Sequence, residues 1–262
     1  MAESLVGRTA VFFVARMSST RLTRKVLRPM AGKPLILQQM DRVQMAQKPD
    51  LFVLCTTDSP HDDELALVVS DYGLPVFRGP ELDVPRRLLL AAEKFDVDHF
   101  VLVEADEHFV DPDHVDAVLN YIEKNGGDWV HVVGNPIGSW VRGISRHAVK
   151  TICSEMKTEG LDGWGAFFEK QPERFKLAEI QLMSDEDAAF NDGIRLTIDY
   201  LEDFLLAEEL YQRLYRLGSP VRIVDVVRTL QENPDLIKIN LYRQDQYMEN
   251  IIAKSGGLMG DH

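Results

Sequence analysis

Long apolar segments and cysteines are both scarce in this chain of 262 residues. No stretch approaches the roughly 18 to 20 uninterrupted apolar residues that a membrane-spanning helix needs. The segment Met1–Arg8 lacks the basic and apolar regions of a signal peptide. Cys55 and Cys153 are the only two cysteines, and neither has a Cys or His neighbour at metal-binding spacing. Two isolated thiols are typical of a reducing compartment. We therefore expect a cytoplasmic protein with no membrane partner.

Several nucleotide-binding and hydrolytic motifs are also missing. Gly32-Lys33 is followed by Pro34 and lacks the upstream glycine of a P-loop, and no G-x-G-x-x-G follows the first predicted strand. Neither G-x-S-x-G nor H-E-x-x-H occurs. These absences argue against P-loop NTPases, dinucleotide-dependent oxidoreductases, serine hydrolases and zinc proteases.

Acidic residues are absent between Glu3 and Asp41, although the chain carries a formal net charge of −13. This stretch holds the hydroxyl residues Ser18, Ser19 and Thr20 among the cations Arg16, Arg21, Arg24, Lys25, Arg28 and Lys33. Because an acidic protein repels nucleic acid, a local basic loop favours a small, concentrated anion such as a nucleoside triphosphate. The alternative is a solvated surface loop, which the missing counter-ions and interleaved hydroxyl groups disfavour.

Short apolar runs alternate with helical patterns through the first half of the chain. The apolar runs predict strands at 10–14, 51–56, 74–77, 99–104 and 128–133, and the helical patterns lie at 34–47, 62–72, 83–95 and 113–125. This alternation is typical of βαβ units in a mainly parallel α/β sheet, which binds ligands at the carboxyl ends of its strands. We therefore expect one pocket shared by the basic loop, Thr56-Thr57-Asp58, Arg78-Gly79 and Glu104-Ala105-Asp106.

The pattern becomes less regular beyond residue 134. A helix is expected near 145–157, and the segment at about 150–193 is expected to be an inserted arm that acts as a lid or a subunit contact. A strand-like run follows at 194–199, and helices are expected at 202–216 and 221–231. Because no linker or repeat is visible, we expect one domain over 1–262 with a mobile tail from about residue 253.

The basic segment resembles a known motif. It reads Ala15-Arg16-Met17-Ser18-Ser19-Thr20-Arg21-Leu22-Thr23-Arg24-Lys25, with Gly32-Lys33-Pro34-Leu35 downstream. This closely resembles the A-R-x-(G/A)-S-T-R-L-P-G-K motif of the cytidylyltransferases that activate acidic sugars. They include the 3-deoxy-manno-octulosonate and acylneuraminate enzymes and the spore coat polysaccharide biosynthesis protein F group. Weaker matches in the family's order extend the resemblance over about residues 9–241.

The resemblance implies a three-layer, Rossmann-like nucleotidyltransferase fold of the GT-A type and a homodimeric assembly. It implies Mg-dependent transfer of CMP from CTP to an acidic sugar or other small anionic acceptor, with release of pyrophosphate, in surface polysaccharide or glycoconjugate biosynthesis. The implied catalytic residues are Arg16, Arg21, Lys25 and Asp106. The implied nucleotide-binding residues are Ala15, Arg16, Ser18, Ser19, Thr20, Arg21, Lys25, Thr56, Thr57, Asp58 and Arg78. The implied magnesium ligands are Asp106 and Asp199.

Simpler roles remain open for three of these residues. Asp106 and Asp199 each follow a predicted strand, where an aspartate often caps the next helix. Arg78 is placed near the nucleobase by the resemblance, but it can equally pair with a surface carboxylate.

The chain departs from the family motif near the expected acceptor. Thr23-Arg24 replaces Pro-Gly, which predicts a less tightly turned loop, and Glu107-His108 replaces a small residue and proline. Arg142 stands about where a glutamate is frequent, which favours an acceptor with a carboxylate or phosphate, or else a structural salt bridge. We expect acceptor contacts from Arg142, His108 and Arg87. His108 is a candidate base, and the alternative is a surface pair with Glu107.

Two other functions compete with this interpretation. A GT-A glycosyltransferase would use Glu104-Ala105-Asp106 as a variant D-x-D metal motif, but it does not need the triphosphate clamp of Arg16, Arg21 and Lys25. The substitutions at Thr23, Arg24, Glu107 and Arg142 also leave room for a non-catalytic nucleotide-binding relative.

Overall fold

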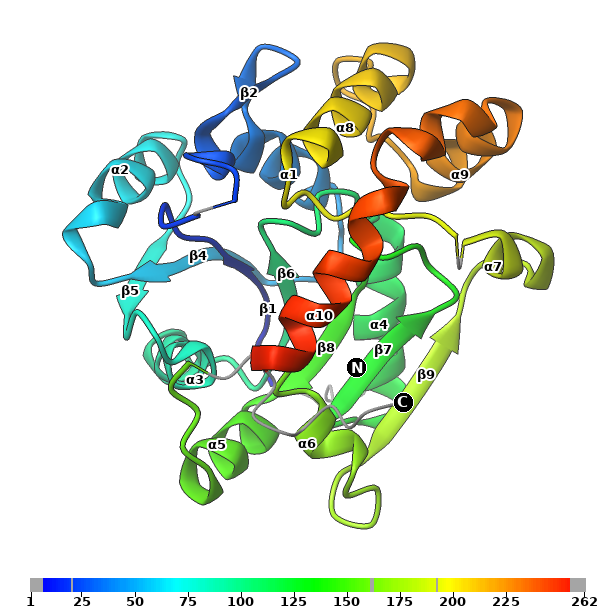
Figure 1. The fold of residues 1–262 in the computed structure, drawn as a ribbon. Helices are drawn as coiled ribbons and strands as arrows, with labels where there is room; N and C mark the ends of the chain where they lie inside the picture. The colour runs from blue at the N-terminus through cyan, green and yellow to red at the C-terminus, as the bar shows by residue number, and fades with distance from the viewer. Residues whose placement is uncertain (1–6, 20, 161–162, 192, 255–262) are drawn as a thin grey trace.

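A twisted, mainly parallel sheet forms the centre of the protein. The computed structural model describes residues 7–19, 21–160, 163–191 and 193–254. The described strands of the main sheet follow the order β5-β4-β1-β6-β8-β7-β9, and β8 alone among them runs antiparallel to its neighbours (Figure 1). Their bounds are β1 Thr9–Val14, β4 Leu51–Thr57, β5 Val76–Gly79, β6 His99–Glu104, β7 Trp129–Val133, β8 Arg142–Ser145 and β9 Leu177–Gln181. A separate hairpin pairs β2 Pro29–Met30 with β3 Lys33–Pro34.

Helices cover both faces of this sheet. They are α1 Leu35–Val43, α2 Asp63–Asp71, α3 Val84–Phe95, α4 Pro112–Asn125, α5 Arg146–Glu155, α6 Ala166–Glu169, α7 Asp185–Asn191, α8 Leu201–Leu214, α9 Ile223–Glu232 and α10 Gln244–Lys254. Short 3-10 turns lie at η1 Lys25–Leu27, η2 Pro60–Asp62, η3 Pro234–Ile239 and η4 Leu241–Arg243. The predicted three-layer α/β fold is confirmed, and each of the five predicted strands in the first half exists.

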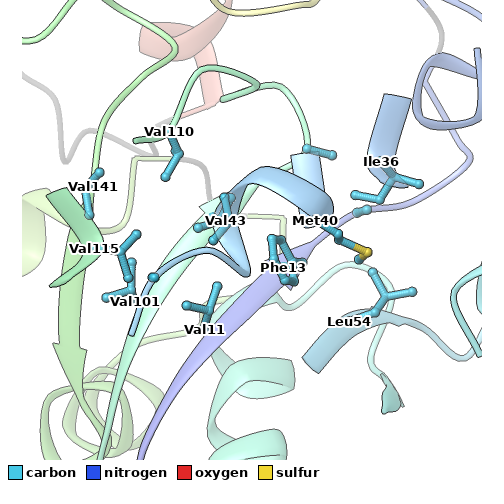
Figure 2. Packing of buried hydrophobic residues seen from close by; sticks show 14 of the residues in the cluster. Val11, Phe13, Ile36, Met40, Val43, Leu54, Val101, Val110, Val115 and Val141 are labelled. Atoms are coloured by element: carbon cyan, nitrogen blue, oxygen red, sulfur yellow. The ribbon is translucent and has the colours of Figure 1, made fainter. Parts of the chain in front are cut away.

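The alternating side chains of β1 explain the two faces of the core. Val11 and Phe13 pack against α1 and α4 on one face, and Figure 2 shows both of them with Met40 and Val101. Phe12 packs on the other face against α3 and α5. All of these side chains are fully buried, and burying one such side chain contributes about 1.5–3 kcal/mol. The apolar run at 10–14 therefore forms an interior strand of the sheet, paired with β4 and β6.

A third apolar cluster lies beside the two faces of the sheet. It joins α8 and α9 to Leu22 and Met30 from the segment after β1 and to Phe109 from the segment after β6. The C-terminal half of the chain thereby supports the loops at the carboxyl ends of the strands.

The predicted arm at 150–193 is more ordered than the sequence indicates. It contributes α6, α7 and the edge strand β9, which pairs in parallel with β7. Trp164, Phe168 and Phe175 pack in the core face of α3 and α5, so this part of the segment belongs to the main domain. Its role as a lid or subunit contact stays a prediction.

Two expectations about the C-terminal half need correction. Residues 194–199 form no strand but an extended segment with one bridge, between Ile137 and Arg195. A helix, α10, occupies Gln244–Lys254, where no element was expected, and most of the predicted mobile tail lies outside the described residues. In the described part of the chain, no helix is both long and apolar enough to cross a bilayer.

Candidate active site

The basic loop leaves β1 at the carboxyl edge of the sheet and is anchored by a buried aspartate. The Met17 N–H donates to Asp62 Oδ1 at 2.7 Å. The other oxygen of Asp62 accepts from the Thr56 hydroxyl at 2.9 Å and from the Thr57 N–H at 3.1 Å. Burial alone would raise the pKa of Asp62, but these hydrogen bonds outweigh it and lower the pKa. The start of the loop is therefore held by a charged acceptor inside the core.

This anchor changes the interpretation of the segment after β4. Thr56 and Thr57 are at most 1% exposed, and both hydroxyls donate to Asp62. Both hydroxyls are therefore used within the protein, and the nucleotide-binding role of this strand end stays a prediction. Asp58 is exposed, and its N–H donates to the Gly79 carbonyl at 2.9 Å. The threonines hold the residue that positions the basic loop.

Arg78 and Arg87 also face protein groups. Arg78 donates to the Thr57 and Ser59 carbonyls at 2.8 and 2.7 Å and pairs with Asp63 at 2.6 Å. This is the surface-carboxylate alternative. Arg87 is 1% exposed and donates to the Pro80 carbonyl at 3.0 Å. Neither arginine belongs to the described lining of the acceptor-side cavity defined below, so the acceptor role of Arg87 is not supported by its position.

The central part of the loop presents polar groups toward solvent. Ala15 is buried, whereas Arg16 and Ser18 are exposed. Ser19 turns back, because its N–H donates to the Met17 carbonyl at 2.8 Å. Thr20 lies outside the described residues. The nucleotide-binding roles of these residues stay predictions.

The turn into η1 contains a strained residue. Arg24 has φ 54° and ψ 31°, the left-handed conformation that glycine adopts without cost. Arg24 thus adopts, at the position of the motif's glycine, a conformation that glycine favours. The expectation of a less tightly turned loop stays a prediction.

Asp199 joins the basic loop to the segment between β9 and α8. Its Oδ1 accepts from Arg21 Nη2 at 2.6 Å and from Lys25 Nζ at 3.3 Å. Arg195 lies 3.6 Å from the other oxygen. Burial would raise the pKa of Asp199, but Lys25, Arg21 and Arg195 together lower it. The buried carboxylate of Asp199 thereby binds cations from two distant parts of the chain.

Asp106 lies next to this cluster because two backbone segments cross closely. The Ile198 N–H donates to the Asp106 carbonyl at 3.0 Å, and the Leu196 N–H donates to the Ile137 carbonyl at 2.7 Å. Gly138 makes the approach possible: it has φ +91°, and a Cβ there would lie 2.0 Å from the Thr197 nitrogen. The crossing places both predicted magnesium ligands in one site.

Neither aspartate caps a helix, which removes the simpler alternative. At the start of α8, Asp203 accepts from the Tyr200 N–H at 2.9 Å. At the start of α4, Asp111 accepts from the Asp113 N–H at 3.0 Å. Asp106 and Asp199 are therefore available for another role.

The pair of carboxylates fits a magnesium ion. Among the described side chains, none forms an ion pair with Asp106. Burial raises the pKa of Asp106, and the charge of Asp199 raises it further against the opposing effect of Lys25. Two neighbouring carboxylates, the buried Asp199 and the half-buried Asp106, provide oxygen donors of the kind that Mg²⁺ shares with phosphates and water. Other acidic side chains do not complete a larger cluster in the described parts of the chain.

Two departures from the family motif prove to be partners. Arg142 in β8 donates to Glu107, and it also pairs with Glu104 at 3.2 Å. The guanidinium lies 5.5 Å from the centre of the Trp140 ring. Burial raises the pKa of Glu107 to about 8, with Arg142 acting in the opposite direction. Arg142 is half-buried and its guanidinium is paired with two carboxylates, so the salt-bridge alternative describes Arg142 in this structure.

These residues border a cavity of about 560 Å³, which we call the acceptor-side cavity. Its wall combines Arg21, Asp106 and Arg142 with aromatic side chains and with the segment around α6 and the helix α10. The aromatic and C-terminal lining residues are Trp129, Trp140, Trp164, Tyr247, Met248 and Asn250. The cavity thus opens beside the proposed metal ligands and has room for a small acceptor.

His108 does not face this cavity. It is fully buried, its Nε2 lies 2.9 Å from the Tyr211 hydroxyl, and its ring contacts Phe109 edge-on. Burial, together with the charge of Arg42, holds the pKa of His108 well below its usual range. The predicted base and the alternative surface pair with Glu107 are both wrong, because the side chain turns into the core.

Two positioning residues escaped the sequence analysis. Gln39 in α1 is fully buried and donates to the Glu104 and Glu107 carbonyls at 2.8 and 2.9 Å. Asp62 anchors the basic loop as described above. The available signal was weak: a polar residue within an apolar helix pattern, and an acidic residue soon after a strand.

Comparison with known proteins places this geometry in context. A family model described as cytidylyltransferase matches residues 10–220. The spore coat polysaccharide biosynthesis protein SpsF of Bacillus subtilis is 29% identical over 238 residues, which cover 84% of this chain and 93% of that protein. A 3-deoxy-manno-octulosonate cytidylyltransferase of Colwellia psychrerythraea is 28% identical over 212 residues, which cover 76% of this chain and 70% of that protein.

Solved structures share the fold. A cytidylyltransferase from Leptospira borgpetersenii aligns with a TM-score of 0.78 at 22% identity and covers 88% of this chain and 96% of its own. A CMP:2-keto-3-deoxy-manno-octonic acid synthetase complexed with CTP aligns with a TM-score of 0.60 at 13% identity, covering 79% of this chain and 99% of its own.

Proposed function

The chain belongs to the cytidylyltransferase family and is therefore a nucleotidyltransferase, and we propose that it transfers CMP from CTP to a small anionic acceptor. An oxygen of the acceptor attacks the α-phosphorus, the bond to the bridging β-phosphate oxygen breaks, and pyrophosphate leaves. The acceptor proton passes to solvent. Such a reaction depends mainly on positioning and charge neutralisation.

One observation carries this proposal: Asp199 collects Arg21 and Lys25 of the basic loop next to Asp106 at the wall of the acceptor-side cavity. A triphosphate entering there can take over Arg21 and Lys25 from the carboxylate, because phosphate oxygens accept the same charge-assisted hydrogen bonds. The exposed Arg16 can add a third cation to the pyrophosphate. Asp106 and Asp199 would hold Mg²⁺, which supplies charge neutralisation at the phosphates.

The acceptor-side cavity supports a sugar-sized acceptor. Its volume of about 560 Å³ lies within the range of small-ligand sites, and Arg21 and Arg142 provide positive charge at its wall. An anionic acceptor would draw Arg142 away from Glu107. The similarity to enzymes that are named for 3-deoxy-manno-octulosonate supports an acidic sugar as the first acceptor to test.

We also propose a setting for this reaction. The relative SpsF is named for polysaccharide biosynthesis, which supports a product used in surface polysaccharide assembly. The free thiols Cys55 and Cys153 are compatible with a cytoplasmic enzyme. A homodimer remains part of the proposal, and the edge strand β9 offers backbone groups for such a contact.

The decisive assay measures pyrophosphate release from CTP with magnesium across acidic sugars and phosphorylated acceptors, with ATP, GTP and UTP as competing donors. We expect release that requires both CTP and one acceptor class. Release of CDP or UDP from a sugar nucleotide would instead indicate a glycosyltransferase, and CTP binding without turnover would indicate a regulatory relative. The pairing of Glu104 with Arg142 already argues against a D-x-D role for Glu104.

A further inference from the structure

The C-terminal helix α10 covers the acceptor-side cavity. In Figure 1 it crosses in front of β8 near the carboxyl edge of the sheet. Tyr247, Met248 and Asn250 of this helix line the cavity, on whose wall Asp106 also lies. The match to the family model ends at residue 220, so α10 lies beyond the matched residues. The helix therefore adds residues to the cavity wall that lie outside the basic motif.

Tyr247 is the residue of α10 whose surroundings are best defined. Its ring centre lies 4.3 Å from the Arg195 guanidinium carbon. Arg195 is itself fixed by Asp203, whose oxygens accept from it at 2.9 and 3.1 Å. The ring is thus supported by a buried ion pair, and its position does not depend on the surface of the helix.

The hydroxyl of Tyr247 is suited to donate a hydrogen bond. Burial raises its pKa, and the negative charges of Asp106 and Asp199 raise it further. The group consequently keeps its proton, and a protonated phenol offers one donor. Among the described atoms, this hydroxyl has no hydrogen-bond partner within the protein.

Besides the contact of Tyr247 with Arg195, α10 is held in place by polar contacts and not by apolar packing. Glu202 accepts from Tyr242 at 2.6 Å and from Arg243 at 3.0 Å at the turn before the helix. Further along, Asn250 donates to the Tyr200 hydroxyl at 3.3 Å. None of the described α10 residues belongs to the three apolar clusters. A helix held this way opens at low free-energy cost compared with the core.

We propose that Tyr247 is an acceptor-contacting residue and that α10 opens and closes over the acceptor-side cavity as the acceptor enters and the product leaves. The proposal rests on the proposed function, since it names a residue of the same site. The Tyr247 hydroxyl donates to an oxygen of the acceptor, and CTP binds mainly through the basic loop on the other side of Asp199. The helix thereby acts on the acceptor and leaves the nucleotide largely unaffected.

The first test compares Tyr247→Phe with the matched control Tyr121→Phe. The first change removes only the hydroxyl at the cavity and keeps the ring on Arg195, and the second removes a hydroxyl in α4, outside the cavity lining. With 3-deoxy-manno-octulosonate, or the member of the acceptor panel that is turned over, we expect KM for the acceptor to rise about fivefold to tenfold in Tyr247→Phe. KM for CTP should stay within about twofold, as both constants should in Tyr121→Phe.

The outcomes separate this inference from the proposed function. Turnover with an unchanged acceptor KM in Tyr247→Phe overturns the role of Tyr247 and leaves the function standing. If wild-type protein turns over no acceptor, the proposed function fails and the role of Tyr247 fails with it. Equal increases in both KM values indicate a general disturbance of the site and also contradict the proposal.

Amide hydrogen exchange tests the movement of α10 in the free protein. We expect amides in α10 to exchange at least about 100-fold faster than those in α4, whose buried face packs against the sheet. Exchange in α10 should slow on addition of the accepted sugar with CTP and magnesium. Protection in the free protein equal to that of α4 would overturn the opening step.

Discussion

The basic loop and the helix α10 approach the same site, but they are held by different kinds of interaction. The loop is tied to the interior by Asp62, which is 1% exposed, and by Asp199, which is 2% exposed. The helix is held by Glu202 at the turn before it, by the hydroxyl of the buried Tyr200 and by the contact of Tyr247 with Arg195, and its described side chains remain exposed or half-buried. Buried charged hydrogen bonds are strong and costly to break, whereas exposed ones contribute little.

This difference indicates that the basic loop and α10 have separate roles within the site. The groups expected to bind the triphosphate are positioned before it arrives, which lowers the cost of organising them. The groups on α10 adapt to the acceptor. Perturbing the loop should therefore affect stability and CTP use together, and perturbing the helix should affect the acceptor alone.

The largest effects are expected from the two aspartates between these regions. Asp106→Asn should lower kcat/KM by about 10²–10³-fold or more, because an amide is a poor ligand for magnesium. Folding should be preserved, since no ion pair of Asp106 is lost. Asp199→Asn should lower activity as strongly and also lower the melting temperature, because Arg21, Lys25 and Arg195 lose their shared anion.

Pyrophosphate release and thermal unfolding measure these two effects separately. Asp235→Asn is a suitable control, because Asp235 is exposed and pairs with Lys238 away from the site. Wild-type activity in Asp106→Asn and Asp199→Asn would refute their role as metal ligands.

Gly138→Ala tests the crossing that brings the aspartates together. An alanine there has an unfavourable φ and a Cβ that would collide with the Thr197 backbone. We expect about 2–4 kcal/mol of lost stability and a marked loss of activity. Gly193→Ala is the control, because a Cβ there meets no described atom within 4 Å. Equal stability of both variants by chemical denaturation would show that the two segments do not need this close approach.

Asp62→Asn should weaken the anchoring of the basic loop to the core. Every described partner of the carboxylate is a donor, so one end of the amide places its own donor against the Met17 N–H or the threonines. We expect about 1–3 kcal/mol lower stability. KM for CTP should rise more than KM for the acceptor. The control Asp63→Asn removes only the exposed partner of Arg78, and a matching effect in that variant would argue against the anchor.

The smallest effect on global stability is expected at the anchor of α10. Hydrogen bonds from Arg243 and Tyr242 lower the pKa of Glu202 to about 2. Its folded-state pKa is below the unfolded value, so its stabilising contribution is complete above about pH 4.5 and is lost as the pH falls toward 2. Amide exchange in α10 should speed up over this window relative to α8. In Glu202→Gln, the exchange rate of α10 relative to α8 should no longer rise as the pH falls. If the pH dependence of α10 exchange is the same as in the wild type, other contacts hold the helix.

The parts of the site that depend on local sequence pattern could be predicted from the sequence. The apolar runs located β1, β4 and β6, and the motif around Arg16 to Lys25 indicated the family. Asp106 and Asp199 were found through the resemblance and do lie in one site. The direction of a side chain was harder to predict from the sequence. Thr56 and Thr57 have residue types suited to ligand contact, yet both hydroxyls point toward Asp62.

The sequence by itself determined the alternation of strands and helices, the concentration of positive charge after β1 and the membership of a family. These properties depend on neighbouring residues and on spacing along the chain. The tertiary structure alone decided that Arg142 pairs with Glu107, that His108 is buried against Tyr211 and that α10 covers the cavity. Each of these depends on groups 35 or more residues apart, because a charge or a ring inside a protein is satisfied by whichever distant segment packs against it.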